Sequence, residues 1–313
     1  MSFHVIEPYA IGDAQIVSHS VAALDPSKLW AAGQAWTKDE LCHRAETKRV
    51  YKRVAAGTDA ANAEPPEKTS EVWQDTRACN KFAAFVYTES TATTQKDAQP
   101  LRIKLQVGKR VDTLGLYGVV GHSARVTVRQ AGAVVFGPRT EGLLRREVHG
   151  WFDWFTAPFL QRGAVAFVSL PPLSSAEIEI EILPASGVAS VGYIVCGRAA
   201  YLGDLRWRPN IVGSNFSRIE REFDGSLRPG VSLVQRRTVP GFSGSFRVPA
   251  YNVDRVRRLR DQLNAVPALW VGLATQPNSP YYESVLLYGV YRRLEYTPDN
   301  VHNAEANIEI EEL

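Results

Sequence analysis

The strict alternation of glutamate and isoleucine over residues 177–182 constrains the fold more than any other feature of the sequence. A period of two places the isoleucines on one face of a β-strand and the glutamates on the other, as in an antiparallel sheet with one buried face. The same period recurs over residues 101–107, 124–129 and 308–311, and glycine or proline turn residues separate the runs. Such closely spaced strands predict a mainly β protein, built as a sandwich or as a sheet closed on itself.

Residues 253–265 depart from this pattern and predict one helix. Valine and leucine recur there at intervals of three and four, Asn252 stands at the expected N-cap, and Pro267 follows the expected end. Arginines, Arg257 among them, fill much of the other face. A single arginine cluster is more typical of a helix side that faces solvent or a neighbouring subunit than of a phosphate site.

The chain divides into three expected units. Residues 1–27 carry a strand-like segment that we expect to join a later sheet, formed by residues 201–313 together with the helix. Residues 28–80 differ in character, with lysine, glutamate, paired prolines and tryptophans. Residues 81–200 have the densest strand pattern and form the expected sandwich.

Composition excludes several classes of function. Hydrophobic residues make up 45% and charged residues 22% of the chain, which is typical of a folded globular protein. The formal net charge of +3 is too small to indicate nucleic-acid binding. No segment reaches the roughly 20 consecutive apolar residues of a membrane span, and the N-terminal residues do not resemble a secretory signal. We expect the protein to be made and folded in a cytosol.

The three cysteines give little reason to expect a metal or a disulfide. Cys42, Cys79 and Cys196 are odd in number and have no C-x-x-C spacing, which argues against a disulfide framework or a zinc ribbon. Cys42 next to His43 could contribute to a metal site, but buried thiols are the more common outcome for cysteines spaced this loosely. No metal or cofactor is expected.

A search for catalytic residues also favours a non-enzymatic role. The sequence contains none of the common nucleophile, nucleotide-binding or zinc-protease motifs. His149 and Asp153 flank the aromatic run 151–155 and could perform acid–base work. We favour a corner of the sandwich packed by large rings, with Asp153 accepting from backbone donors. A polysaccharide depolymerase stays an alternative, although no convincing carboxylate pair is found.

Arginine and tryptophan on strand-like segments indicate a subunit interface, because oligomer interfaces are enriched in arginine and aromatic residues. Ordinary solvent exposure is about as common for any single arginine of this kind. The candidate interface residues are Arg206, Trp207, Arg236, Arg237 and, on the predicted helix, Arg257.

Residues 28–80 contain, in this order, two tryptophans, a Val-Tyr-Lys run, a glycine, paired prolines and a closing Trp-Gln-Asp. That order resembles the small carbohydrate-binding modules attached to chitinases. The resemblance implies a small β module and makes Trp36, Tyr51 and Trp73 candidate glycan-binding residues. At residues 53–56, where the family has exposed tryptophans, this chain has Arg-Val-Ala-Ala. The module can therefore keep its fold without its sugar site, and its tryptophans then form the core. The matching positions are Trp30, Trp36, residues 50–52, Gly57, Pro65, Pro66 and residues 73–75.

Further short motifs lie along the chain, from Asn-Lys-Phe-Ala-Ala-Phe at residues 80–85 to Tyr-Gly-Val-Tyr-Arg at residues 288–292. Their order is similar to that in tail-tip or baseplate proteins of tailed bacteriophages. This second resemblance implies a jelly-roll, galactose-binding-like sandwich in residues 81–200, and a tail-tube or distal-tail β domain in residues 1–27 and 201–313. The motifs are residues 80–85, 112–118, 193–197, 201–203, 268–272 and 288–292.

The leading hypothesis is a virion structural protein that links the tail tube to fibres or receptor-contacting parts. It implies assembly in the cytoplasm of a bacterial host, a homo-oligomeric ring and other tail or baseplate proteins as partners. In such a ring, neighbouring subunits cover exposed β surface, so apolar residues need no ligand pocket. The alternative is an adhesin that binds host cell-surface polysaccharide. Both hypotheses exclude nucleic acid and a membrane span.

Overall fold

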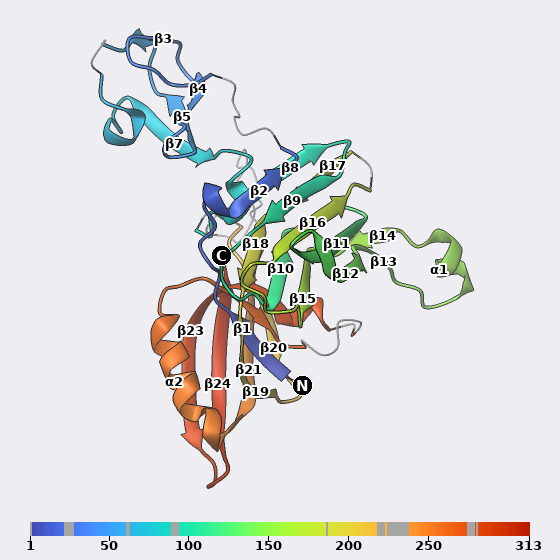
Figure 1. Ribbon diagram of the computed structural model, residues 1–313. Helices are drawn as coiled ribbons and strands as arrows, with labels where there is room; N and C mark the ends of the chain where they lie inside the picture. Colours follow the sequence, from blue (N-terminus) through green and yellow to red (C-terminus); the bar gives the residue numbers. More distant parts are fainter. Residues whose placement is uncertain are drawn as a thin grey trace. The chain divides into compact units, whose positions relative to one another are not determined.

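The computed structural model describes residues 2–21, 28–60, 63–88, 94–185, 187–217, 223, 238–273, 279 and 281–313 (Figure 1). Strands and antiparallel pairings dominate, which confirms the predicted mainly β class. The chain forms two compact units. Unit 1 comprises residues 1–8 and 199–313, and unit 2 comprises residues 9–198.

Unit 2 contains the sandwich. One sheet has five strands, in the order β12-β11-β16-β9-β2, and the other has three, in the order β15-β10-β18. A further strand pair, β8 (Thr94–Asp97) with β17 (Val188–Val191), lies beside them. The sandwich strands are β2 (Ile16–His19), β9 (Leu101–Leu105), β10 (Thr113–Tyr117), β11 (Ser123–Gln130), β12 (Ala133–Gly142), β15 (Ala164–Val168), β16 (Glu177–Leu183) and β18 (Tyr193–Gly197).

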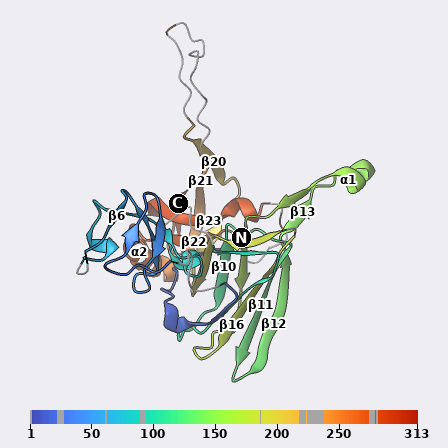
Figure 2. The same cartoon turned by 90° about the horizontal axis from the view of Figure 1, so that it is seen from above.

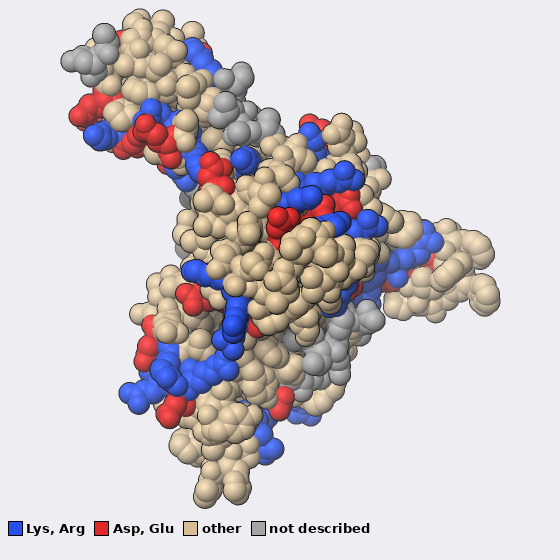
Figure 3. Space-filling model, in the orientation of Figure 1, with Lys and Arg blue, Asp and Glu red and all other residues tan. Residues whose placement is uncertain are grey.

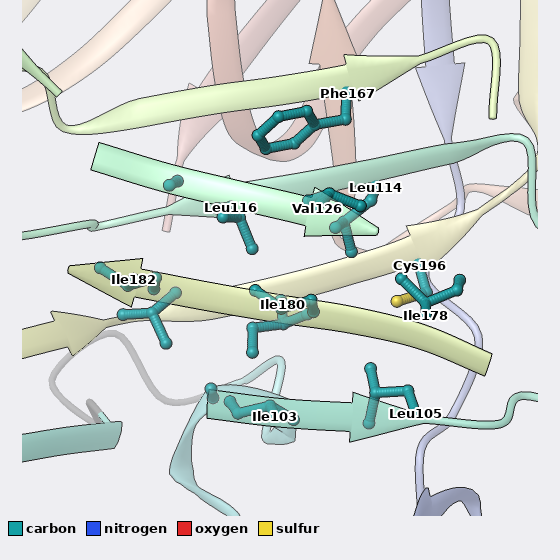
Figure 4. Close-up of a cluster of buried hydrophobic side chains, with 14 of the residues drawn as sticks. Ile103, Leu105, Leu114, Leu116, Val126, Phe167, Ile178, Ile180, Ile182 and Cys196 are labelled. Atoms are coloured by element: carbon teal, nitrogen blue, oxygen red, sulfur yellow. The ribbon is translucent and has the colours of Figure 1, made fainter. Parts of the chain in front are cut away.

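The core of this sandwich explains the alternation in β16. Its isoleucines are buried in one cluster with Leu114, Leu116 and Phe167 of the other sheet (Figure 4). On the outer face, Glu181 lies between Arg102 and Arg125 of the neighbouring strands, with N–O distances of 2.7 and 3.4 Å. Glutamates opposite arginines stabilise adjacent strands and keep that face hydrated. The predicted orientation of the strand is confirmed.

Residues 28–80 form a small module with a core of its own. Its three-stranded sheet consists of β4 (Leu41–His43), β5 (Arg49–Arg53) and β7 (Trp73–Ala78). A second pair joins β3 (Ala35–Trp36) to β6 (Gly57–Thr58), and the short helix η2 (Pro66–Lys68) precedes β7. The core residues are Trp30, Trp36, Cys42, Tyr51 and Trp73.

In unit 1 the strand order is β19-β1-β22-β23-β24-β21-β20, and β19 also pairs with β21. That additional pairing closes six of the strands into a ring, and β20 pairs only with β21 among the described residues. At the closure a Cβ on Gly203 would lie 2.2 Å from the carbonyl oxygen of Arg247, so only glycine allows this approach. The strands are β1 (Ser2–Ile6), β19 (Ala199–Leu205), β20 (Asn210–Asn215), β21 (Thr238–Pro249), β22 (Ala268–Val271), β23 (Leu286–Pro298) and β24 (Asn303–Glu312).

The interior of unit 1 is aromatic, and one helix packs against it. The ring of Phe3 lies 5.3 Å from that of Phe246 and 6.1 Å from that of Trp270. The predicted helix is α2 (Val253–Gln262), which ends three residues before the expected position. Asn252 does not cap it with its side chain. Its buried amide instead donates to the carbonyls of residues 201 and 202, which ties the helix start to β19.

The expected boundary at residue 27 is wrong. Unit 1 takes only residues 1–8 from the N-terminus, because β2 pairs with β9 and belongs to the sandwich. The second change of unit falls between residues 198 and 199, close to the expected position. The finer assignments, a jelly roll and a tail-tube-like domain, stay predictions. The remaining short helices are η1 (Asp13–Gln15), η3 (Ala83–Phe85), η4 (Ala250–Asn252) and η5 (Glu283–Val285).

Candidate functional site

Two surfaces expose apolar side chains on well-formed backbone, one in each unit. Among the described residues, no group of three or more His, Cys, Asp or Glu side chains could hold a metal ion. In the same part of the chain, no helix has the length and apolar character that crossing a bilayer requires. The two apolar surfaces are the candidate binding sites for other molecules.

The first surface is the edge formed by β20. Six uninterrupted pairs join β20 to β21, and within the described residues β20 has no other strand neighbour. All six of its residues are exposed, including Ile211 at 48% and Val212 at 45%. Figure 2 shows β20 beside β21 at one side of unit 1. Such an edge offers unpaired backbone N–H and C=O groups together with apolar side chains.

An apolar depression adjoins this edge. It encloses about 270 Å³ and is lined by residues of unit 1 alone. Trp207 forms part of its wall and is one of the most exposed large side chains of the unit. We call β20 and this depression the β20 surface. Its depression is lined by Leu205, Arg206, Trp207, Arg208, Pro209, Ile211, Leu273, Ser279, Tyr281 and Val285.

The predicted interface residues are only partly gathered at this surface. Arg206 and Trp207 line the depression, and Arg206 also pairs with Glu305 across 3.1 Å within the same unit. Arg257 is exposed on α2 and does not line the depression. Arg236 and Arg237 lie outside the described residues.

The second surface is an arm that leaves the sandwich between β12 and β15. Strands β13 (Leu144–Arg146) and β14 (Phe159–Gln161) form its stem, and α1 (Trp151–Thr156) lies at its end (Figures 1 and 2). The Gln161 side chain fixes the base by donating to the carbonyls of Val119 and Leu143, at 3.4 and 3.3 Å. We call residues 144–161 the aromatic arm.

Most large side chains of the aromatic arm point into solvent. Trp151 is 85% and Phe152 77% exposed, although tryptophan and phenylalanine usually lie inside a fold. A concentration of exposed apolar side chains on a monomer marks an interaction site. The exposed apolar residues of the arm are Val148, Trp151, Phe152, Trp154, Phe155, Phe159 and Leu160.

The structure corrects our interpretation of this segment. We expected the rings to pack a corner of the sandwich, but they form a separate projecting helix. Asp153 does accept a backbone hydrogen bond, from the N–H of His149 at 3.0 Å, as expected. Its carboxylate therefore holds the start of the helical turn, and the hydrogen bond runs to the backbone of His149 and not to its imidazole.

The candidate glycan-binding rings lie in the core of the small module. Trp36 and Tyr51 are each 3% and Trp73 is 2% exposed, and Trp36 meets Trp73 edge to face at 5.0 Å. A sugar stacks on an exposed ring face, so these three residues cannot bind a glycan in that way. The glycan-binding assignment of these rings is wrong, and the adhesin hypothesis is left without its candidate residues.

The cysteines are buried thiols. Cys42, Cys79 and Cys196 form no disulfide. Burial raises the pKa of Cys196 to about 12, and burial with the nearby Asp59 carboxylate raises that of Cys42 to about 12. Both thiols therefore stay protonated and unreactive at neutral pH. That the chain is not an enzyme stays a prediction.

Comparison with protein-family models, with curated proteins and with solved structures found no match to this chain.

Proposed function

We propose that this protein is a structural component of a phage tail tip or baseplate, in which copies of unit 1 join into a ring through the β20 surface. In this role it links the tail tube to fibres or receptor-contacting parts, after assembly in the cytoplasm of a bacterial host. The observation that carries the proposal is the β20 edge, which no other strand of the described residues covers. The order of motifs along the sequence supports the phage assignment.

The β20 edge differs from the other long exposed edge of the protein. Strand β12 also exposes two valines, Val134 and Val135, but its pairing with β11 contains register shifts and the strand includes Pro138. Proline and bulges are common devices that block pairing with another chain. The pairing of β20 with β21 is regular and β20 contains no proline. Of these two edges, β20 is therefore the one suited to accept a further strand.

The contact also favours a ring over a symmetric pair. The β20 surface combines a strand edge with an apolar depression containing Trp207, and a neighbour must offer a different surface to fill the depression. Contacts between unlike surfaces generate closed rings when the rotation closes. Exposed tryptophan and arginine beside an apolar depression are typical of the residues that carry binding energy in such contacts.

The double variant Ile211→Lys/Val212→Lys is expected to convert the multimer into single chains at the same protein concentration. Two lysines place adjacent positive charges on the edge and remove its apolar contact without touching the core. Light scattering on a size-exclusion column measures the masses. Val134→Lys/Val135→Lys is the matched control and keeps the multimer. A multimer that survives in the β20 variant contradicts the proposal.

A further inference from the structure

We infer that the aromatic arm is a membrane-interface anchor, whose rings enter the boundary between headgroups and acyl chains of a bilayer that contains anionic lipid. This inference does not depend on ring formation, because all of its residues lie in unit 2. The arm would lie against the lipid surface without spanning it.

The rings share one side of α1. Successive helical residues are rotated by about 100°, so Trp151, Phe152, Trp154 and Phe155 occupy a sector of roughly 160°. The polar side chains on the remaining side of the helix form hydrogen bonds with the backbone. The carboxylate of Asp153 accepts from the N–H of His149, and the Thr156 hydroxyl donates to the carbonyl of Phe152 at 2.8 Å. One turn of helix thus separates an apolar side from a polar one, which is the arrangement of interfacial helices.

Contacts within the arm hold the helix on its stem. The guanidinium of Arg146 donates to the carbonyl of Trp154 at 2.6 Å and lies over the ring of Phe159 at 4.2 Å. These contacts join the helix to both strands of the stem. The rings are therefore displayed in the free protein, and binding costs little ordering of the backbone.

The charges of the arm favour an anionic surface. The stem and its base carry three arginines, Arg145, Arg146 and Arg162, and the arm has two carboxylates, Glu147 and Asp153. The carboxylate of Asp153 is engaged at the helix start. Figure 3 shows Lys and Arg side chains along the stem and a large uncharged surface at its tip. When an apolar tip is inserted, basic residues behind it reach the depth of the lipid headgroups. There each positive charge is stabilised by electrostatic attraction to anionic lipids.

The shape of the tip favours lipid over a protein pocket or a sugar. Besides the four rings of α1, Val148, Phe159 and Leu160 are exposed on the chain at both ends of the helix. Exposed apolar side chains thus lie on the helix and on the chain at either side of it, at the projecting end of the arm. A fluid interface adapts to such a surface, and tryptophan favours that interface because its ring is both apolar and able to donate a hydrogen bond.

Vesicle flotation tests the inference, with vesicles of phosphatidylcholine alone or mixed with phosphatidylglycerol. The full chain is expected to float with the mixed vesicles and much less with phosphatidylcholine alone. Trp151→Ser/Phe155→Ser is expected to lower the partition coefficient at least tenfold, because two exposed rings are lost. Arg145→Gln is expected to reduce the preference for phosphatidylglycerol. Tyr251→Ser, which removes an exposed aromatic ring in unit 1, is the control and floats like the unaltered chain.

Three outcomes would overturn the inference: an unaltered chain that stays with the sediment, a double variant that floats as well as the unaltered chain, or equal flotation with both vesicle types. If Trp151→Ser/Phe155→Ser changes the mass of the multimer but leaves flotation unchanged, the arm binds a protein partner and not lipid. Because the substituted side chains are exposed, unchanged thermal unfolding is expected for every variant and shows that a loss of flotation is not a loss of folding.

Discussion

Ile180→Glu is expected to unfold the sandwich of unit 2. The Ile180 side chain has no exposed surface and lies among apolar side chains of both sheets (Figure 4). A glutamate there must bury its carboxyl group without a partner, at a cost of several kcal/mol. Because a domain is stable by only about 5–15 kcal/mol, this substitution alone removes most of the stability. Circular dichroism during urea unfolding measures the effect.

The reverse substitution one residue earlier is the matched control. Glu179 lies on the outer face of the same strand, 3.1 Å from Arg129 and 3.6 Å from Lys104. Glu179→Ile removes both ion pairs, which are partly exposed on the outer face of the sheet, and is expected to cost about 1 kcal/mol or less. If the two substitutions destabilise the protein equally, the two faces of β16 do not differ as the structure requires.

Asp59→Ala is expected to destabilise the small module by about 3–5 kcal/mol, which is enough to unfold it. Arg53 and Asp59 form a 2.7 Å ion pair in which both side chains are only 7% exposed. Asp59 also accepts from the indole N–H of Trp30 at 3.1 Å. Without Asp59 the guanidinium of Arg53 stays buried over the ring of Trp73 with no opposing charge. Amide hydrogen exchange of residues 49–53 and 73–78 reports unfolding of the module separately from the sandwich.

A double variant tests whether the effect of Asp59→Ala comes from the unpaired buried charge of Arg53. Arg53→Met/Asp59→Leu removes both charges and fills their space with apolar groups. Replacing a buried ion pair in this way is often neutral or stabilising. We therefore expect hydrogen exchange close to that of the unaltered chain. Exchange as fast as in Asp59→Ala would show that the module depends on Asp59 for a reason other than charge compensation.

The strands and the helix could be predicted because each follows from local periodicity. Residues 177–182 and 308–311 alternate strictly, and they form parts of β16 and β24 with their apolar residues buried. The helix follows from spacings of three and four, and Val256 and Leu263 are its buried contacts. Periodicity identifies the buried face of a segment, but it carries no information about which strand will be its neighbour.

That limit accounts for the wrong boundary at residue 27. The segment before residue 20 reads as a strand, yet only its long-range pairing shows that β2 joins β9 and not the sheet of unit 1. The closure of unit 1 through β19 and β21 has the same origin. It rests on two residue pairs more than forty positions apart, with Gly203 at the crossing.

The candidate surfaces were only partly predictable. Arg206 and Trp207 could be identified from the preference of interfaces for arginine and aromatic residues. The arm could not, because a run such as residues 151–155 is apolar whether it packs inside or projects outside. At Trp36, Tyr51 and Trp73 the family resemblance implied binding rings, but Arg-Val-Ala-Ala at residues 53–56 already favoured a core role for the tryptophans. All three residues lie in the module's core.

The mass of the unaltered chain in solution tests the central claim most directly, namely that the sheet surface left open in unit 1 is made for other copies of the protein. Native mass spectrometry over a wide range of protein concentration, together with electron microscopy of the same sample, provides the measurement. The account predicts closed rings with one fixed number of copies. A single chain at every concentration would contradict it.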